Sequence, residues 1–270
     1  MKIILSRKGF DTENGRIPSP ILPDGTLLSL PIPEAGSKRR FADVTYRGVP
    51  YERIITDLGG KPEMAAGGCH LDPDLRPPLP TASYAAEWVS AFGQIGAAQG
   101  HLHNQGVGGG DLFLFFGRFR QTECVGGRLR YAPGSSPQHI VYGYLQVGEV
   151  VCGDAIAASY PWHPHASYTG ANNTLYVAAS HLAGTKLPGA GTLSCRDKLV
   201  LTAPGRDLSQ WKLLDWMKNV PISYHGKASV HEDEGYFQST ARGQEFVIEA
   251  TPAVRAWATD LICGCALGGR

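Results

Sequence analysis

The stretch "DLFLFFGRFR" (111–120) decides the fold that the sequence predicts. Successive side chains of an extended strand point to opposite faces. Both faces are apolar here, with Leu112, Leu114 and Phe116 on one face and Phe113, Phe115 and Phe119 on the other. A strand that is apolar on both faces lies in the centre of a sheet or in the wall of a barrel. We therefore expect the rest of the chain to be built around this strand.

Shorter apolar runs on both sides of this stretch predict further strands. They begin at Lys2 and continue through 26–33, 41–51, 128–137, 139–151, 173–180, 191–202 and 236–249.

Three helices are predicted between these strands. In 81–98, the residues Tyr84, Trp88, Phe92 and Ile95 recur at helical spacing. A second helix is expected over 208–217, and a third begins after the cap Thr251 and ends at Gly264. Strands outnumber helices and do not alternate with them, which favours the α+β class. We expect one β-rich domain over residues 1–270, built around a β-barrel or bent sheet with flanking helices.

Composition limits the classes of protein that remain. The chain of 270 residues has 25 Lys plus Arg against 24 Asp plus Glu, a net charge of +1. A protein that coats nucleic acid through phosphates alone is more basic than this. The start "MKIILSRKGF" is too short in apolar residues for a signal peptide or a membrane span. The 6 cysteines form no paired C-x-x-C motifs, so we expect a cytoplasmic protein with free thiols.

Histidines cluster in a way that suggests a metal or a catalytic group. An H-x-H pair on a strand points both rings to one face and offers two imidazoles to one metal, and a nearby aspartate adds an oxygen ligand. The alternative is that these are loop histidines satisfied by hydrogen bonds, because neither H-x-H pair lies in a clear strand. The candidate ligands of a divalent metal are His70, Asp72, His163 and His165. The candidate catalytic residues are His101, His103 and Asp11.

Polar loop residues could bind a nucleotide. In "SRKGFDTENG" (6–15), Arg7 and Lys8 can bind a phosphate together with backbone N–H groups of the turn at Gly9, and Asp11 can orient a sugar or act as a base. Amides that donate and accept side by side can read the edge of a base. The alternatives are a solvated turn and loop capping. The candidate base-reading residues are Asn104, Gln105, Asn172, Asn173, Gln244 and Glu245.

The segment 81–155 resembles the core of the PUA-like barrels, which include the EVE and YTH domains. The resemblance rests on "GVGGGDLFLFF" (106–116) followed by "IVYGYLQVGEV" (140–150). It implies a pocket at the barrel mouth that holds one nucleotide base, with residues 101–110 as the loop over that mouth.

The whole chain is similar to a narrower family, the third of the nucleotide-modification-associated domain families. The matching pieces are "SRKGFDTENGRIPSPILPDGTLLSLPIP" (6–33), "HLDPDL", "HLHNQGVGGGDLFLFFGRFR", "PWHPH" with "NNTLYVA", and "RGQEFV". Gly109 and Arg118 depart from the pattern, which expects Pro and Trp there. The family implies a role in modifying nucleotides or DNA bases, without a mechanism.

Two functions of different classes therefore remain open. The first is a protein of nucleotide or DNA-base modification that holds a nucleotide or a flipped base in a pocket, with no membrane partner. The second is a metal-dependent enzyme that uses the histidine cluster on an unrelated small substrate. A purely structural protein is disfavoured, because the polar residues concentrate in loops beside strands, where sites usually lie.

Overall fold

The computed structural model describes residues 1–75, 88–170, 172–240 and 245–265. Its strands are β1 (Lys2–Arg7), β2 (Ser19–Ile21), β3 (Ile32–Pro33), β4 (Thr45–Tyr46), β5 (Val49–Pro50), β6 (Cys69–His70), β7 (Ala91–Gln94), β8 (Leu112–Val125), β9 (Arg128–Tyr131), β10 (Gln138–Cys152), β11 (Thr174–Ala178), β12 (Ala190–Thr192), β13 (Gln210–Lys212), β14 (Val230–His231), β15 (Tyr236–Gln238) and β16 (Glu245–Glu249). Its α-helices are α1 (Tyr51–Asp57), α2 (Pro62–Ala65), α3 (Gly96–Asn104), α4 (Ala155–Ser159) and α5 (Pro252–Cys263). Its short 3-10 helices are η1 (Phe41–Asp43), η2 (Pro164–Ser167), η3 (Asp197–Leu199), η4 (Asp215–Lys218) and η5 (Lys227–Ser229).

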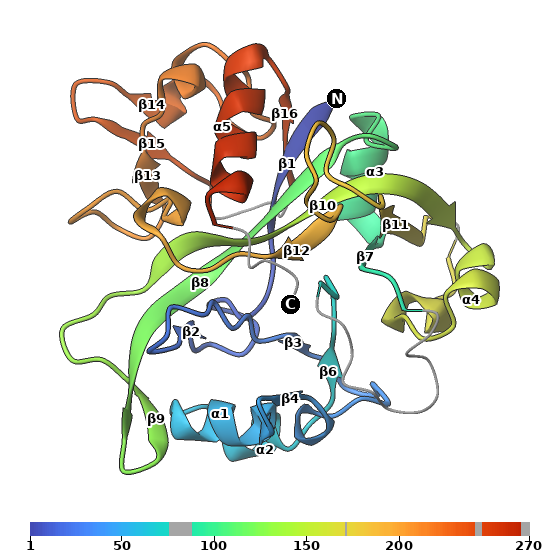
Figure 1. The fold of residues 1–270 in the computed structure, drawn as a ribbon, viewed down its shortest axis with the longest axis vertical. Helices are drawn as coiled ribbons and strands as arrows, with labels where there is room; N and C mark the ends of the chain where they lie inside the picture. The colour runs from blue at the N-terminus through green and yellow to red at the C-terminus, as the bar shows by residue number, and fades with distance from the viewer. Residues whose placement is uncertain (76–87, 171, 241–244, 266–270) are drawn as a thin grey trace.

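The main sheet is organised around the long strands β8 and β10, which run diagonally through the molecule (Figure 1). Its strand order is β16-β1-β8-β10-β11-β7, with β2 and β9 also paired to β8 and β12 paired to β10. Leu112 to Phe116 are all buried, as expected for a strand covered on both faces. The central strand predicted at 111–120 is therefore confirmed, and it continues to Val125.

Strand β1 lies between β8 and β16. It pairs in parallel with β8, Ile3 opposite Leu112, and antiparallel with β16, Ile3 opposite Ile248. Asp111 fixes the start of this arrangement, because its carboxylate accepts the backbone N–H groups of both Lys2 and Gly108. The glycine-rich stretch before β8 is thus held onto β1 by Asp111.

The sheet does not form the expected barrel. Among the described residues the strand path ends at β16 on one side and at β7 on the other, and no pairing joins them. The molecule is a sheet-rich mixed α and β fold built around this sheet, and the PUA-like barrel is not confirmed.

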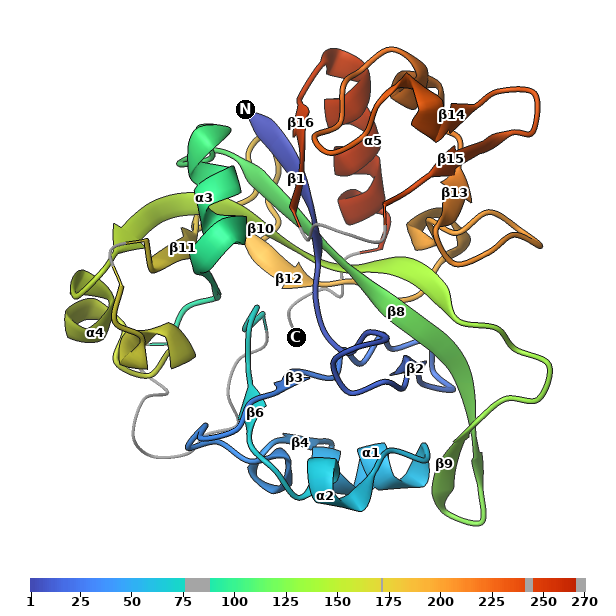
Figure 2. The same cartoon turned by 180° about the vertical axis from the view of Figure 1, so that it is seen from behind.

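Smaller units flank the main sheet on opposite sides (Figures 1 and 2). Helices α1 and α2 pack with the loop after β1 around a separate apolar cluster that includes Phe10, Phe41 and Ile55. The three-stranded sheet β13-β15-β14 and α5 lie at the other end, and Trp211 and Leu261 join the main core from there. No helix among the described residues is long and apolar enough to span a bilayer.

One of the three predicted helices is confirmed, and the other two ranges contain strands. Helix α5 is confirmed with its cap, since Thr251 Oγ1 accepts the N–H of Val254. The prediction of a helix over 81–98 is wrong for Ala91–Gln94, which is strand β7 and pairs with β11, whereas 96–98 are helical as the start of α3. Residues 81–87 lie outside the described residues. The predicted helix 208–217 is instead the strand β13 followed by the start of η4.

Several predicted strands also differ from the structure. Residues 41–51 form η1 and the two-residue strands β4 and β5, and 26–33 contributes only β3. The second half of 191–202 is η3 with single bridges in place of a strand. Most residues of 41–51 and of 191–202 are not buried, whereas Leu27, Leu28 and Leu30 are buried without forming a strand.

Candidate functional site

A cavity of about 210 Å³ opens where segments far apart in the sequence meet. The loop after β1, the strands β3, β6 and β7, and the segment of η2 all contribute to its wall. The polar side chains on that wall include Arg7, Lys8, Asp11, Glu34, His70, Asp72, Gln94, His165 and Tyr168.

Local structure explains why these segments converge. Lys8 extends the pairing of β1, because its N–H donates to Phe116 O on β8. Gly9 then turns the chain with a φ of +82°, and a Cβ there would lie 2.7 Å from Ser29 Oγ. The turn brings Arg7 and Lys8 to the cavity, while the pairing of β6 with β3 brings His70 beside Glu34.

Asp72 lies at the centre of a buried histidine cluster. Its Oδ2 is 3.4 Å from His70 Nε2 and 3.4 Å from His165 Nε2. Its Oδ1 accepts the N–H of Gly93 at 2.9 Å. These three side chains are at most 8% exposed, so their mutual geometry is set by the interior and not by solvent.

Outer partners fix the orientation of both rings. Asn173 Nδ2 donates to the backbone oxygens of His165 and Tyr168, so Asn173 Oδ1 is the acceptor of the 2.7 Å hydrogen bond from His165 Nδ1. His70 Nδ1 is 3.2 Å from Glu34 Oε2, and Tyr168 donates its hydroxyl to the other oxygen of Glu34. In both rings the Nδ1 is occupied and the Nε2 faces Asp72.

His163 lies behind this cluster. Its Nδ1 accepts the N–H of His165 at 3.2 Å, which places a ring proton on Nε2. That Nε2 is buried without a hydrogen-bond partner and lies 3.8 Å from Asp72 Oδ1. Burial lowers the pKa of His163 to about 3, so the ring is neutral.

The charges of Asp72 and of the histidines beside it depend on one another. Burial alone would lower the pKa of His70, but the hydrogen bonds and charges of Asp72 and Glu34 outweigh it and the pKa is raised. Burial alone would raise the pKa of Asp72, but the hydrogen bonds from His165 and His70 outweigh it and hold the pKa below its usual range. Asp72 is therefore an anion in the interior, which requires positive partners.

A second buried network borders the same cavity. Lys8 Nζ and Gln94 Nε2 both donate to Glu245 Oε1, each at 2.7 Å. Glu245 is 1% exposed, and its Oε2 has no hydrogen-bond partner. Lys8 Nζ also lies 4.7 Å from the centre of the Phe92 ring. Glu245 is thus a buried carboxyl group that accepts hydrogen bonds from one lysine and one amide.

Several other candidates are not among the residues that line the cavity: His101, His103, Asn104, Gln105 and Asn172. Residues 101–105 do not form a loop over a barrel mouth: His101, His103 and Asn104 are on α3, and Gln105 is its C-cap. His101 Nε2 is 3.0 Å from Ser223 Oγ, so the expected convergence of His101 with His163 and His165 is not observed. Asn172 is exposed and bonds to the backbone of Gly96. Gln244 lies outside the described residues.

Four site residues were missed by sequence reasoning. Gln94 and Gly93 were hidden inside the predicted helix 81–98. Glu34 and Tyr168 carry no local signal, because their role depends on contacts with His70 across 36 and 98 residues of sequence. Asp11, which was predicted, lines the cavity and also caps its own turn by accepting the N–H groups of Glu13 and Asn14.

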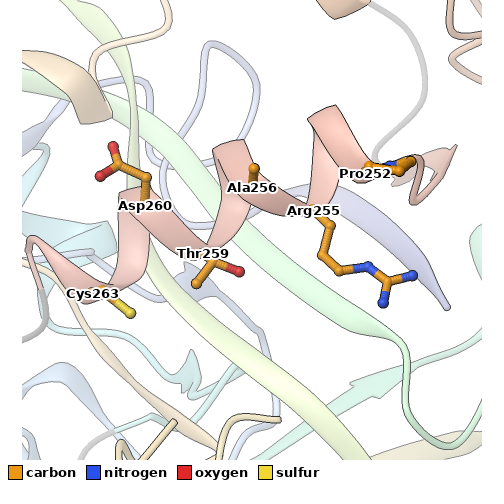
Figure 3. Close-up of a pocket in the computed structure, with 6 residues that line it drawn as sticks. All are labelled: Pro252, Arg255, Ala256, Thr259, Asp260 and Cys263. Carbon is orange, nitrogen blue, oxygen red and sulfur yellow. The ribbon is translucent and has the colours of Figure 1, made fainter. Parts of the chain in front are cut away.

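A larger hollow of about 640 Å³ lies along α5 (Figure 3). Its six lining residues, among them Arg255, Thr259 and Asp260, all come from that one helix. A surface formed by one face of one helix has no opposing wall to surround a ligand, so the cavity beside Asp72 is the better candidate site.

Comparison with known proteins gives one match. A family model described as nucleotide modification associated domain 3 matches residues 2–249, a range that contains every residue of the cavity wall. No curated protein and no solved structure matches the chain.

Proposed function

Because the chain belongs to the nucleotide modification associated domain 3 family, we propose that the cavity beside Arg7 and Asp72 binds a nucleotide, either free or as a base flipped out of DNA. The observation that supports this most is the convergence of buried polar groups from distant segments on one cavity. Such convergence is costly unless the groups serve a ligand or each other.

The size of the cavity favours one part of a nucleotide. Pockets that enclose a drug-sized ligand measure roughly 300–1,000 Å³. At about 210 Å³, this cavity fits a base or a sugar and leaves the rest of the nucleotide outside. An enzyme that acts on a base in DNA must first extrude it from the stack, and a small pocket suits that substrate.

Arg7 is the residue suited to the phosphate. Lys8 lies beside it on the cavity wall and forms an ion pair with Glu245 at 2.7 Å. Burial lowers the pKa of Arg7, and the carboxylates of Asp11, Glu13 and Glu245 act against that shift. A guanidinium retains its charge in either case and binds phosphate through two parallel hydrogen bonds. Gln94, also on the wall, offers a donor and an acceptor for a base edge.

Calorimetric titration tests this proposal. Nucleoside monophosphates, and a DNA duplex with one unpaired base, are titrated into wild type and Arg7→Met in a buffer with chelator. Loss of charge-assisted hydrogen bonds to phosphate is expected to weaken binding about 10- to 100-fold. Arg53→Met is the matched control, because Arg53 is exposed and does not line the cavity. Equal affinity in Arg7→Met, or no binding by wild type, would refute the proposal.

A second candidate is a metal-dependent enzyme that acts on a different small substrate. The cluster of His70, Asp72 and His165 favours it, since imidazole and carboxylate are common ligands of catalytic metals. A wild-type protein that binds a metal ion but none of the nucleotides would support this second candidate over the first.

A further inference from the structure

We propose that His70 Nε2, Asp72 Oδ2 and His165 Nε2 bind one divalent first-row transition-metal ion at the wall of the cavity. One ligand atom from each of these residues lies within 4.8 Å of the other two. The proposal depends only on atoms of this chain, so it stands whether or not the cavity binds a nucleotide.

The spacing of the ligand atoms fits an ion between them. Nitrogen and oxygen ligands bind zinc at about 2.1 Å, and in a tetrahedral arrangement such ligand atoms lie about 3.4 Å apart. Asp72 Oδ2 is 3.4 Å from Nε2 of His70 and 3.4 Å from Nε2 of His165. The two distances from Asp72 Oδ2 to the imidazole nitrogens therefore already match the separation between two ligand atoms of one bound zinc ion.

The hydrogen bonds on the far side of each ring point to the same conclusion. A singly protonated His165 has its proton on Nδ1, bonded to Asn173 Oδ1, so the lone pair of Nε2 faces the carboxylate of Asp72. A proton or a metal ion between Nε2 and the carboxylate makes this contact favourable, so a bound metal ion would take the place of a proton there. His70 has the same partners, with Glu34 at its Nδ1 and Asp72 at its Nε2. Metal-binding histidines almost always have such a partner at the other ring nitrogen.

His163 lies against this site without being one of its ligands. Its Nε2 is buried, has no hydrogen-bond partner, and lies 3.8 Å from Asp72 Oδ1. His163 itself is a positioning residue in this proposal, because its Nδ1 is occupied by a backbone N–H and its Nε2 carries the proton.

The ligand set indicates a reactive centre and not a structural one. Structural zinc sites use four protein ligands, mostly cysteines, whereas catalytic sites use three protein ligands and keep a position open. Here two imidazoles and one carboxylate bind, and all three residues line the cavity. The open coordination positions therefore face the space where the substrate would lie.

Metal titration tests the proposal without a nucleotide. Protein stripped with chelator is titrated with Co²⁺ and Zn²⁺, bound metal is counted by elemental analysis, and the visible absorption of Co²⁺ reports its ligands. We expect one ion per chain in wild type and a more than 100-fold weaker affinity in Asp72→Asn. Asn at position 72 is isosteric and can still accept the N–H of Gly93, so the fold is preserved. His70→Gln is the second ligand variant.

His181→Ala is the matched control, because it removes one exposed imidazole outside the cluster and is expected to leave affinity unchanged. No stoichiometric binding by wild type, or equal affinity in Asp72→Asn and His70→Gln, would overturn the metal site. Because nucleotide binding is measured separately in chelator, failure of one proposal is distinguishable from failure of the other.

Discussion

Replacing Gly93 with alanine would push the buried His165 ring out of its present position, because the added Cβ would overlap with the ring. A Cβ on Gly93 would lie 2.3 Å from His165 Cδ2 and 2.6 Å from its Nε2, whereas ordinary contacts are 3.4–4 Å. Either the ring or strand β7 must therefore move by about 1 Å. The substitution acts on one ligand ring of the proposed metal site without changing any chemical group there.

The cost follows from how firmly the ring is held. His165 is 3% exposed, is bonded to Asn173 at 2.7 Å, and packs edge-on against His70 and Tyr168. Overpacking of a buried site costs about 1–3 kcal/mol, and a weakened hydrogen bond adds about 1 kcal/mol. We expect Gly93→Ala to lower the free energy of unfolding by about 2–4 kcal/mol. At about 2 °C per kcal/mol for a chain of this size, Tm falls by roughly 4–8 °C.

Urea unfolding followed by circular dichroism measures this change, and metal titration of the same variant shows whether His165 still binds. Gly100→Ala is the matched control, because a Cβ at Gly100 in α3 meets no atom within 4 Å. Alanine is favoured over glycine inside a helix by about 1 kcal/mol, so the control is expected to be neutral or stabilised. A Gly93→Ala protein with wild-type stability and wild-type metal affinity would refute the reasoning about the Gly93–His165 contact.

Three further predictions concern the stability of the folded protein. Burial lowers the pKa of His139 to about 3, so the unfolded chain binds a proton that the folded chain does not, and stability is lost as pH falls from about 6.5 toward 3. His139→Asn, which keeps an acceptor for Trp211 Nε1, should reduce that loss between pH 6.5 and 4.5 by about 2 kcal/mol in urea unfolding. Lys8→Met leaves Glu245 buried without its cation and should destabilise the protein by about 3–5 kcal/mol. Thr251→Ala removes the cap of α5 and should lower the free energy of unfolding by about 1 kcal/mol.

Each of these has a control or a contrary outcome. Lys198→Met breaks an exposed pair with Asp260 and should cost less than about 1 kcal/mol, so an equal loss in Lys8→Met would contradict the buried-pair argument. An unchanged pH dependence in His139→Asn would show that other groups dominate acid unfolding. Thr251→Ser keeps the hydroxyl and should retain the cap, and a Thr251→Ala protein as stable as Thr251→Ser would show that the cap contributes nothing.

Strands and helices could be predicted from the sequence where one short stretch already contains the apolar residues that they bury. Leu112 to Phe116 are apolar on both faces, and helix α5 has its cap and its apolar face in 12 residues, so both were predicted correctly. The spacing of Trp88, Phe92 and Ile95 suggested a helix, but Ala91–Gln94 pairs with β11 about 80 residues later. That pairing overrides the local pattern, and Ile95 is left 37% exposed.

The residue types of the candidate site could be predicted, but not which of them meet. His70, Asp72 and His165 converge only because β6 pairs with β3 and Gly93 on β7 donates to Asp72. The pair His101 and His103 has the same H-x-H spacing, but it lies on α3, where residues two apart do not share a face. The H-x-H motif at 163–165 therefore contributes His165 to the cluster and places His163 behind it, whereas the motif at 101–103 contributes neither residue.

The position of β1 has a consequence for how the protein is made. Residues 2–7 leave the ribosome long before both of their neighbours in the sheet, and the ion pair of Lys8 waits for Glu245, 237 residues later. Contacts between such distant segments slow folding, and an unpaired apolar strand is prone to aggregate meanwhile. Nascent chains stalled before residue 245 should therefore bind chaperones through this segment. The ion pair that Lys8, on the cavity wall, makes with Glu245 would therefore form only after residue 245 has been synthesised.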